Sequence, residues 1–381
     1  MKIYFVNLPS DGKLRLNNAM LGTIQVCESM GHVTTVFDAD SNKALNPNLL
    51  KIDLRRQIDW DVVMIDKIET KHQLAKEYVK VIKMMRPEAV IIGTEDYTNP
   101  IKESETIINF KEVNVFIDGF AEVIMPGLLD IVFNQRFDQT KGTVYLYNGA
   151  VERVPFTDET VDPFYFPIPS YDSVNMIIYL NSMCEPLGDY KKAQKRVMNV
   201  LWTRGKYRAL PERAVEQASA LRNMYAIDEI IIDDPDFLDS PSWVKQFLKV
   251  WNDNSLYRYM SFIIKTVSWP VDDGLLWNLK ESGCRRIEIG IGVGVEFNAD
   301  VIHGVVDLLR RNLIQEWDIT FKLDSVATAR DLASFCKHEN IKCKTIIPTS
   351  VITEANLQLL GLQNLLDQGK FDDVISYNLV A

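Results

Sequence analysis

MKIYFVNLPSDGKLRLNNAMLGTIQVCESMGHVTTVFDAD, residues 1–40, sets the architecture of the N-terminal half. The apolar run at 3–8 predicts a strand, and the pattern across 17–30 predicts a helix that ends at Gly31, a residue suited to the left-handed position after a helix. A second strand is predicted at 33–37. Strand, helix and strand in this order are typical of a doubly wound parallel sheet.

The same alternation continues to residue 117. Strands are predicted at 62–65, 89–92 and 113–117, and a helix at 71–85. In such sheets ligands bind outside the carboxyl ends of the strands. The candidate binding residues there are Pro9, Asp38, Asp66, Lys67, Thr94, Glu95, Asp118 and Gly119. The alternative is that polar residues and glycine are simply what these turns require.

The segment after the first sheet predicts a hairpin and then a domain boundary. Asn148-Gly149 lies between two strand-like runs within 142–155, and this dipeptide favours a two-residue turn. Residues 158–171 are rich in aromatic residues and proline, which suits a docked, extended linker. We therefore expect a Rossmann-like domain at 1–140, a hairpin and linker at 141–195, and a second domain at 196–381.

The C-terminal half shows six strand-helix repeats. Six repeats are too few to close an eight-fold barrel, so an open, partial (β/α) barrel is predicted. The strands are expected at 197–202, 229–232, 260–265, 286–291, 319–323 and 343–347. The helices are expected at 211–224, 241–251, 272–281, 299–311, 326–338 and 354–366. A last run at 374–379 is expected to cap the sheet edge.

Several predicted barrel strands carry charged residues where a buried parallel strand is normally aliphatic. These residues are Asp233, Lys265, Glu288, Lys322 and Lys344. If they face the barrel interior, they must pair with one another or with a ligand, because burying a lone charge is expensive. The first four are candidates for acid-base catalysis. The alternatives are structural ion pairs or outward-facing side chains.

Composition excludes some classes of partner. The net charge of -10 and the pI near 5.1 argue against nucleic acid, whose binding requires clustered Lys and Arg. No apolar run approaches a membrane span, and the chain begins directly with a strand, so we expect no membrane association and a cytoplasmic location. The five cysteines are scattered without the spacing of a zinc or cluster site, so no metal ligands are assigned.

The order of these pieces resembles the radical S-adenosylmethionine (SAM) proteins that carry an N-terminal cobalamin-binding domain. The resemblance spans nearly the whole chain and implies a cobalamin-binding-type Rossmann-like domain followed by a radical-SAM-type barrel. It is carried by Leu21-Gly22, Gly31-His32-Val33, Phe37 to Asp40, Gly93 to Thr98, Asp118 to Glu122, the Asn148-Gly149 hairpin and the linker at 162–171.

One stretch departs sharply from this family. Where the family has Ser/Thr-Arg-Gly, a CxxxCxxC loop and then Tyr-Arg, this chain has VLWTRGKYR at 200–208, without the cysteine loop. Three thiolates of that loop hold the iron-sulfur cluster that delivers an electron to SAM. The resemblance therefore implies that this member has no cluster.

The rest of the SAM site is only partly retained. Ile289 to Gly294 lies where the family has Gly-Ile/Leu-Glu-Ser, so the usual glutamate is missing, whereas the acidic pair Asp233-Asp234 is kept. The residues that the resemblance marks for a SAM-type cofactor are Thr203, Arg204, Gly205, Asp234 and Gly290.

The sequence does not decide between binding and absence of cobalamin. Residues 9–13, PSDGK, contain no histidine to ligate cobalt, although many relatives also lack that histidine. Glu95, Asp96 and Tyr97 replace a small, glycine-rich loop where the corrin would approach the backbone. The resemblance leaves cobalamin or SAM as possible cofactors.

These features of the sequence are consistent with three alternative functions. The first is a pseudoenzyme that binds a protein partner, such as an active radical SAM subunit, or a small ligand. The second is an enzyme with a repurposed polar barrel pocket that uses no radical. The third is a cobalamin- or SAM-binding protein that transfers a methyl group by polar displacement.

Overall fold

The computed structural model describes residues 1–9, 14, 16–41, 46–56, 60–95, 104–156, 167–183, 185–187, 190–204, 207–234, 236–266, 273–291, 318–323, 343–348 and 374–379. The chain forms two compact units. Unit 1 contains Met1–Cys184 and Lys206–Arg213, and unit 2 contains Glu185–Gly205 and Ala214–Ala381. The domain limits expected at residues 140 and 195 stay a prediction.

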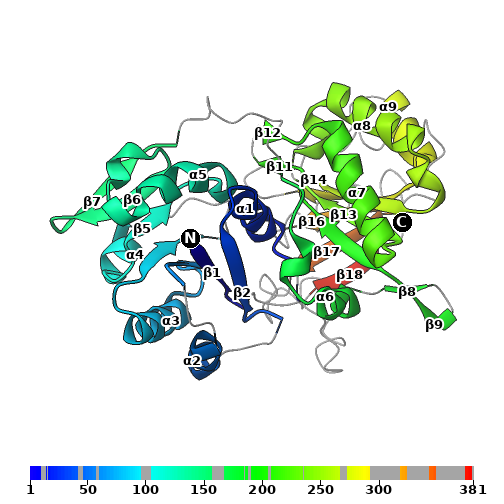
Figure 1. Cartoon of the computed structure of the whole chain (residues 1–381). Helices are drawn as coiled ribbons and strands as arrows, with labels where there is room; N and C mark the ends of the chain where they lie inside the picture. Colours follow the sequence, from blue (N-terminus) through cyan, green and yellow to red (C-terminus); the bar gives the residue numbers. More distant parts are fainter. Residues whose placement is uncertain are drawn as a thin grey trace. The chain divides into compact units, whose positions relative to one another are not determined.

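Unit 1 is built on a seven-stranded sheet in the order β2-β1-β3-β4-β5-β6-β7 (Figure 1). Its strands are β1 Lys2–Asn7, β2 Val33–Asp38, β3 Val62–Ile65, β4 Val90–Gly93, β5 Val115–Ile117, β6 Thr143–Tyr147 and β7 Ala150–Val154. Strands β1 to β5 pair with their neighbours in parallel, in the pairs β1–β2, β1–β3, β3–β4 and β4–β5. The pairs β5–β6 and β6–β7 are antiparallel. The predicted doubly wound sheet is confirmed.

The predicted hairpin is confirmed and extends this sheet. Asn148 and Gly149 both have positive φ angles, 49° and 82°, as a tight two-residue turn requires. Because β6 pairs with β5, the hairpin forms the antiparallel end of the first sheet.

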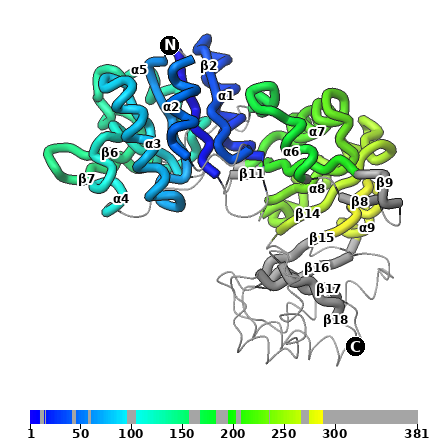
Figure 2. The backbone as a smooth tube through the Cα atoms, turned by 90° about the horizontal axis from the view of Figure 1, so that it is seen from below, coloured from blue at the N-terminus to red at the C-terminus, as the bar shows by residue number. Residues whose placement is uncertain are grey.

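Helices cover both faces of this sheet. The helices of this unit are α1 Asn18–Ser29, α2 Pro47–Arg56, α3 His72–Met85, α4 Ser104–Asn109, α5 Ala121–Ile131 and α6 Met176–Met183, of which α6 lies at the edge of the sheet, where its Tyr179 contacts Asp38. Helices α1 and α5 lie against each other, and α2 and α3 lie side by side (Figure 2). Alternate residues of β1, including Tyr4 and Val6, pack in one core with residues of α2 and α3.

Unit 2 contains a second seven-stranded sheet in the order β10-β13-β14-β15-β16-β17-β18. Its strands are β10 Val197–Val200, β13 Glu229–Asp233, β14 Ser261–Thr266, β15 Cys284–Ile291, β16 Asp318–Leu323, β17 Cys343–Pro348 and β18 Val374–Leu379. All neighbours pair in parallel except β17 and β18, which are antiparallel. The predicted edge strand at 374–379 is therefore confirmed.

The helices of unit 2 that the structure describes are α7 Pro211–Tyr225, α8 Pro241–Asp253 and α9 Asp273–Glu281. The helices predicted at 299–311, 326–338 and 354–366 lie outside the described residues. Aromatic rings join α8 to the sheet, since Phe262 of β14 lies 6.0 Å from Phe247 and 5.3 Å from Trp251 between ring centroids. Burial of such rings is a large apolar contribution to this core.

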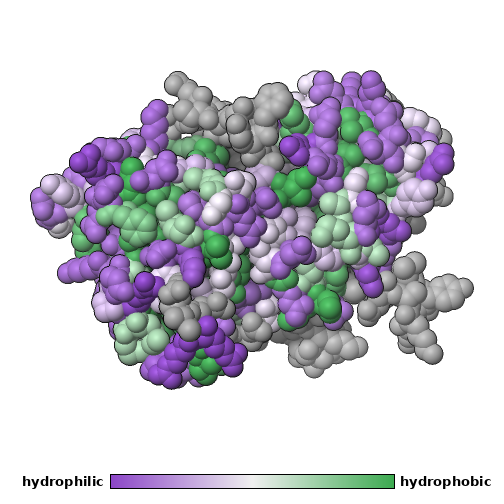
Figure 3. All heavy atoms as spheres, in the orientation of Figure 1, coloured by the Kyte–Doolittle hydropathy of each residue, from purple (hydrophilic) through white to green (hydrophobic). Residues whose placement is uncertain are grey.

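The remaining elements are short. They are β8 Glu185–Leu187, β9 Tyr190–Lys195, β11 Thr203–Arg204, β12 Tyr207–Arg208, and the 3-10 helices Val132–Asn134, Phe137–Gln139, Tyr171–Ser173, Phe237–Asp239 and Leu256–Arg258. On the face drawn in Figure 3, hydrophilic and hydrophobic residues are interspersed over the described part of the chain. Among the described residues, no helix has the length and apolar character needed to cross a bilayer.

Candidate functional site

The register of the second sheet places the predicted charged residues in one row. Asp233 lies opposite Lys265, and Lys265 lies opposite Glu288. Glu288 is followed by Thr320 and then Lys344 on the next two strands. Neighbouring strands are about 4.8 Å apart, so acidic and basic positions alternate at that spacing across β13, β14 and β15.

This row lies on the face of the sheet opposite α8. Phe262 packs on α8, and successive residues of a strand point to opposite faces, so Ile263 and Lys265 face away from that helix. In-register partners in a parallel pair share a face. We call this the polar face. It carries Asn199, Asp233, Lys265, Arg286, Glu288, Asp318, Thr320, Lys322 and Lys344.

The register places the charged residues of β13, β14 and β15 at adjacent positions, and their pairing stays a prediction. Asp233 and Lys265 are both half-buried. Lys265 has a carboxylate-bearing residue on either side of it in the row, because Asp233 and Glu288 are its two register partners. Such a row can hold an ion-pair network or bind a ligand of mixed charge, so the catalytic roles of these residues stay predictions.

Sequence reasoning missed part of the polar face. Asn199, Arg286, Asp318 and Thr320 share it, and Arg286 and Asp318 are direct register partners. Polar residues at alternate positions of predicted strands were the signal that could have identified them. Lys322 lies one step further along β16, opposite Gly290 on β15.

The amino ends of these strands hold a separate ionic cluster. Glu229 is fully buried and accepts hydrogen bonds from Arg285 Nε and Nη2, both at 2.7 Å. Lys195 Nζ at 2.8 Å and Ser261 Oγ at 2.7 Å also donate to it. Burial acts to raise the pKa of Glu229, but these donors outweigh burial and hold the pKa below its usual value. This end of a barrel normally serves stability.

The region where the resemblance places a cysteine loop contains two short strands. The short strands β11 and β12 are hydrogen-bonded to each other and are separated by only residues 205 and 206. Just before them, Trp202 is buried and its Nε1 donates to Gln217 Oε1 at 2.8 Å. Thr203 and Arg204 form β11, whereas Gly205 lies outside the described residues.

The described cysteines are poor metal ligands. Cys27 and Cys284 are free and buried. Burial raises the pKa of Cys27 to about 12 and raises the pKa of Cys284 further. Metals bind the thiolate, which such burial disfavours. Within the described ranges, no group of three or more His, Cys, Asp or Glu side chains is arranged to hold a metal ion.

Asp234, the second member of the acidic pair, stabilises the turn after β13. It is fully buried, its backbone N–H donates to the Lys265 carbonyl at 3.1 Å, and its Oδ1 accepts from the Asp236 N–H at 3.1 Å. The carboxylate therefore has a structural role in this turn. Its predicted role toward a cofactor is untested.

In the first sheet the chain order reverses between β1 and β3, the position where doubly wound folds bind ligands. In this protein, residues that follow β1 and β3 are hydrogen-bonded to each other at that position. Asp66 Oδ1 accepts from the Leu8 N–H at 2.6 Å, and Lys67 Nζ donates to the Leu8 carbonyl at 2.6 Å and to Asn7 Oδ1 at 3.3 Å. Lys67 Nζ also lies 3.3 Å from Asp66 Oδ2.

Helix α6 adds a tyrosine to this edge. The Tyr179 hydroxyl donates to Asp38 Oδ2 at 2.8 Å, and Asn7 Nδ2 donates to Asp38 Oδ1 at 2.8 Å. Tyr179 is fully buried, and burial together with the Asp38 carboxylate raises its pKa. The sequence offered no indication that a residue 141 positions away would meet Asp38.

The end of β4 is also filled by protein. Glu95 accepts hydrogen bonds from the Glu69 N–H at 2.9 Å and from the Thr70 N–H at 3.3 Å, and it pairs with the Thr70 hydroxyl. A Cβ on Gly93 would lie 2.5 Å from Ile68 Cδ1 and 2.7 Å from Phe116 Cδ1. The space that this glycine leaves is therefore taken by side chains.

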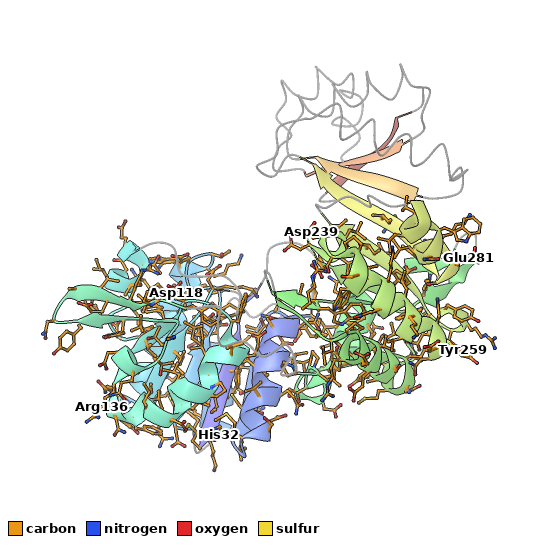
Figure 4. All side chains as sticks on the ribbon, turned by 90° about the horizontal axis from the view of Figure 1, so that it is seen from above. His32, Asp118, Arg136, Asp239, Tyr259 and Glu281 are labelled. Atoms are coloured by element: carbon orange, nitrogen blue, oxygen red, sulfur yellow. The ribbon has the colours of Figure 1, made fainter. Side chains whose placement is uncertain are left out.

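Two further candidates lie near this edge. The Thr94 hydroxyl is fully buried and has no hydrogen-bond partner. Asp118, which is labelled in Figure 4, forms an ion pair with Arg153 of the hairpin at 3.0 Å. Gly119 has a φ of +152°, a backbone conformation that glycine adopts readily. The structure thus brings Asp38 and Asp66 into one network through Asn7 and Lys67, and places Glu95 and Asp118 in separate contacts.

The described residues at this edge are engaged in contacts within the protein. A corrin needs close approach to small residues at the strand ends. Here Ile68 and Phe116 fill the space beside Gly93, while Lys67, Asp66 and Tyr179 are bonded within the edge. The loops at 10–13 and 96–103 lie outside the description.

Comparison with solved structures shows the fold. The chain is similar to the cobalamin-dependent S-adenosylmethionine radical enzyme OxsB, solved with aqua-cobalamin and SAM bound, with a TM-score of 0.67 and 13% identity over 96% of this chain and 56% of that one. It is also similar to the radical SAM methyltransferase TsrM from Kitasatospora setae, solved with tryptophan and a SAM analogue, with a TM-score of 0.62 and 12% identity over 89% of this chain and 71% of that one.

This likeness establishes the architecture and confirms the predicted fold class. The structural neighbours are cobalamin-dependent radical SAM enzymes, as the resemblance in sequence implied. The chain spans about 56% of the length of OxsB. No protein-family model matches the sequence, and no curated protein matches it significantly.

Proposed function

We propose that this chain is a non-radical relative of the cobalamin-dependent radical SAM enzymes, a pseudoenzyme that binds a small ligand or an active radical SAM subunit. One observation carries the proposal. The strands β11 and β12 pair with only two residues between them, at the position where the family's cysteine loop is expected. A two-residue connection cannot supply three cluster-binding thiolates.

The chemistry of the remaining residues supports a binding role. The two buried cysteines described, Cys27 and Cys284, have raised thiol pKa values and lie on different elements. The polar face of the second sheet keeps acidic and basic residues in register, a pattern suited to a charged small molecule. The net charge of -10 argues against nucleic acid as the partner. Free cysteines support a cytoplasmic location.

Anaerobic reconstitution tests the proposal directly. The full chain would be incubated with iron, sulfide and reductant beside OxsB as the positive control, and iron, sulfide and SAM cleavage would be measured. We expect iron well below one cluster per chain and no reductive cleavage of SAM. A stoichiometric, redox-active cluster together with SAM cleavage would refute the pseudoenzyme.

Copurification addresses the protein partner. The chain would be coexpressed with a candidate radical SAM subunit and analysed by size-exclusion chromatography with light scattering. A stable complex is expected if the partner is protein. A chain that remains monomeric beside each candidate would restrict the proposal to a small ligand.

A second candidate function is an enzyme that uses the polar face without a radical. The register row Asp233, Lys265 and Glu288 favours it, because three ionisable residues adjoin at one level of the sheet. Lys265 would act as counter-ion to both carboxylates, and Asp233 or Glu288 would carry protons. Turnover that survives iron chelation and is lost in Asp233→Asn and Glu288→Gln would support it.

The third candidate, methyl transfer through cobalamin, has weaker support, because residues 9–13 contain no histidine to ligate cobalt and Glu95, Asp96 and Tyr97 stand where the family has a small, glycine-rich loop. Incubation with hydroxocobalamin and desalting would test it. We expect the visible absorbance to be lost on desalting. Retention of one corrin per chain would favour this alternative.

A further inference from the structure

The two free edges of the first sheet differ in how they are protected. Strands β2 and β7 end the sheet, and each pairs with a described strand on one side only. Strand β7, with the sequence AVERV, carries Glu152 and Arg153 and is followed by Pro155. Charged residues and proline on an edge strand oppose pairing with another chain. The β7 edge is therefore protected against edge-to-edge association.

Strand β2 lacks these protective features. Residues 33–37, VTTVF, include neither a charged residue nor proline, and they pair with β1 in continuous register. Val33 is 59% exposed, and residues 34–36 are half-buried. Valine, threonine and phenylalanine all favour strands. A regular, uncharged edge of this composition is a template on which another strand can pair.

The backbone groups at the open side of β2 belong to Thr34 and Val36. The Val33 N–H donates to the Met1 carbonyl at 3.0 Å, so Val33 directs its backbone groups toward β1. This direction alternates along a strand, so residues 33, 35 and 37 face β1, whereas the N–H and C=O groups of residues 34 and 36 point away from it. Within the described part of the chain, no strand lies on that side of β2.

We propose that β2 pairs antiparallel with β2 of a second copy of this chain, related to it by a two-fold axis. An axis at Thr35 sets Thr34 opposite Val36 of the second copy, so the outward groups of both strands bond to each other. Thr35 then lies opposite the same residue of the second copy, and Val33 lies opposite Phe37. Threonine pairs and pairs of aromatic with β-branched residues stabilise a sheet, and no like charges meet in this register.

The same construction disfavours self-pairing of β7. Tyr147 and Ala150 flank the two-residue turn and bond to each other, so Val151 and Arg153 direct their backbone groups away from β6. Pairing these groups with a second copy sets Glu152 opposite Glu152. Like charges directly opposite each other destabilise a strand pair. Charge therefore selects β2 as the edge that joins two copies.

Sedimentation velocity on the full chain, over a range of concentrations, tests the self-pairing. We expect a species with twice the mass of one chain that dissociates on dilution. Thr35→Lys sets two ammonium groups opposite each other at the axis, so it should give a monomer at every concentration. Glu152→Lys is the matched control, because it places a lysine at an exposed position of the other edge and should leave the dimer intact. Circular dichroism and thermal melts check that both variants fold.

Disulfide trapping tests the register with a conservative variant. Thr35 and its counterpart form a pair without mutual hydrogen bonds, so their Cα atoms lie about 4.5 Å apart, within the range of about 4.4–6.8 Å that a disulfide spans. Thr35→Cys should therefore form an intermolecular disulfide under mild oxidation. In Thr34→Cys the two new cysteines are diagonal neighbours about 7–8 Å apart and should cross-link much less. Glu152→Cys controls for random collision, and peptide mass spectrometry separates the new disulfide from any that native cysteines form.

A chain that sediments as a monomer at all concentrations overturns the self-pairing, as does trapping of Thr34→Cys or Glu152→Cys as efficient as that of Thr35→Cys. A chain that is monomeric alone but binds another protein through β2 also overturns it, because the edge then serves a different partner. These results are separable from the proposed function. A monomer without a cluster refutes the self-pairing alone, whereas a dimer that assembles a redox-active cluster refutes the pseudoenzyme alone.

Discussion

The Tyr179 hydroxyl donates a hydrogen bond of 2.8 Å to the Asp38 carboxylate, although 141 residues separate them in the sequence. Both residues are buried at the carboxyl edge of the first sheet. Through Asn7 the same contact is joined to Lys67 and Asp66. The edge where this fold type binds ligands is here a continuous network of the protein's own polar groups.

Removal of the Tyr179 hydroxyl should destabilise unit 1. Tyr179→Phe leaves a buried carboxylate with one fewer donor, and we expect a loss of about 1–3 kcal/mol in the free energy of unfolding, measured by urea denaturation. Tyr147→Phe, at an exposed position on β6, is the matched control and should be neutral. An unchanged midpoint for Tyr179→Phe would show that this bond contributes no stability.

The same hydrogen bond makes the stability of the fold depend on pH in the alkaline range. The folded-state pKa of Tyr179 is raised by burial and by Asp38, so its stabilising contribution is complete below the unfolded pKa near 10 and is lost as the pH rises towards the folded value. Tyr179→Phe should therefore lose stability less steeply above about pH 10 than the parent. Tyr4, whose pKa is also raised, leaves some slope in the variant. Thermal melts from pH 8 to 11 would measure it.

The Glu229 cluster should be the most sensitive polar site in unit 2. Glu229→Gln leaves Arg285 and Lys195 without the carboxylate that they share, and breaking a buried pair costs about 3–5 kcal/mol. Because the folded pKa is lowered, the contribution of Glu229 is present above about pH 4.3 and is lost as the pH falls through the folded value. The melting temperature of Glu229→Gln should therefore fall less steeply than that of the parent as the pH is lowered below about 4.3.

Glu281→Gln, an exposed charge change at the end of α9, is the comparison for this variant. It should alter stability by less than about 0.5 kcal/mol. Equal destabilisation by both changes would contradict a special role for the buried cluster.

Asp233 and Lys265 should be energetically coupled. A double-mutant cycle with Asp233→Asn and Lys265→Met should give a coupling of about 0.5–2 kcal/mol, because the residues are direct register partners. Lys265→Met should be the more damaging single change, since Lys265 also adjoins Glu288. A cycle of Asp233 with the distant, exposed Lys249 should show no coupling, and additivity in both cycles would disprove the ionic row.

The bond between Trp202 and Gln217 should hold the base of the β11–β12 hairpin. Gln217→Met leaves the buried indole N–H without its acceptor at 2.8 Å. We expect the free energy of unfolding to fall by about 1–3 kcal/mol, measured by tryptophan fluorescence during urea denaturation. Gln246→Met on the exposed side of α8 is the control. Equal midpoints for the two variants would contradict this assignment.

Cys27 and Cys284 should resist alkylation. With a pKa of about 12 for Cys27 and a raised pKa for Cys284, almost no thiolate exists near pH 8 in the folded chain. Iodoacetamide labelling followed by peptide mass spectrometry should leave both unmodified in the native protein and label both in denaturant. Rapid native labelling of either cysteine would show that its site opens.

Much of the fold was predictable because it is encoded locally. Strand β3 is a continuous apolar run, the helix α1 ends before Gly31, and Asn148-Gly149 specifies a tight hairpin turn. Helices α2, α4, α5 and α6 were not predicted. Helix α5 contains Pro126 and a glycine, which weaken its signal, and α4 has only six residues.

The sequence by itself determined the alternation of strands and helices, the absence of a CxxxCxxC motif from residues 200–208 and the identities of the charged residues on the strands of the second sheet. Only the tertiary structure decided that Asp233, Lys265, Glu288, Thr320 and Lys344 share one row, and that Tyr179 closes over Asp38. The reason is physical: local periodicity is a property of neighbouring residues, whereas strand register and the docking of α6 depend on packing between segments far apart in the chain.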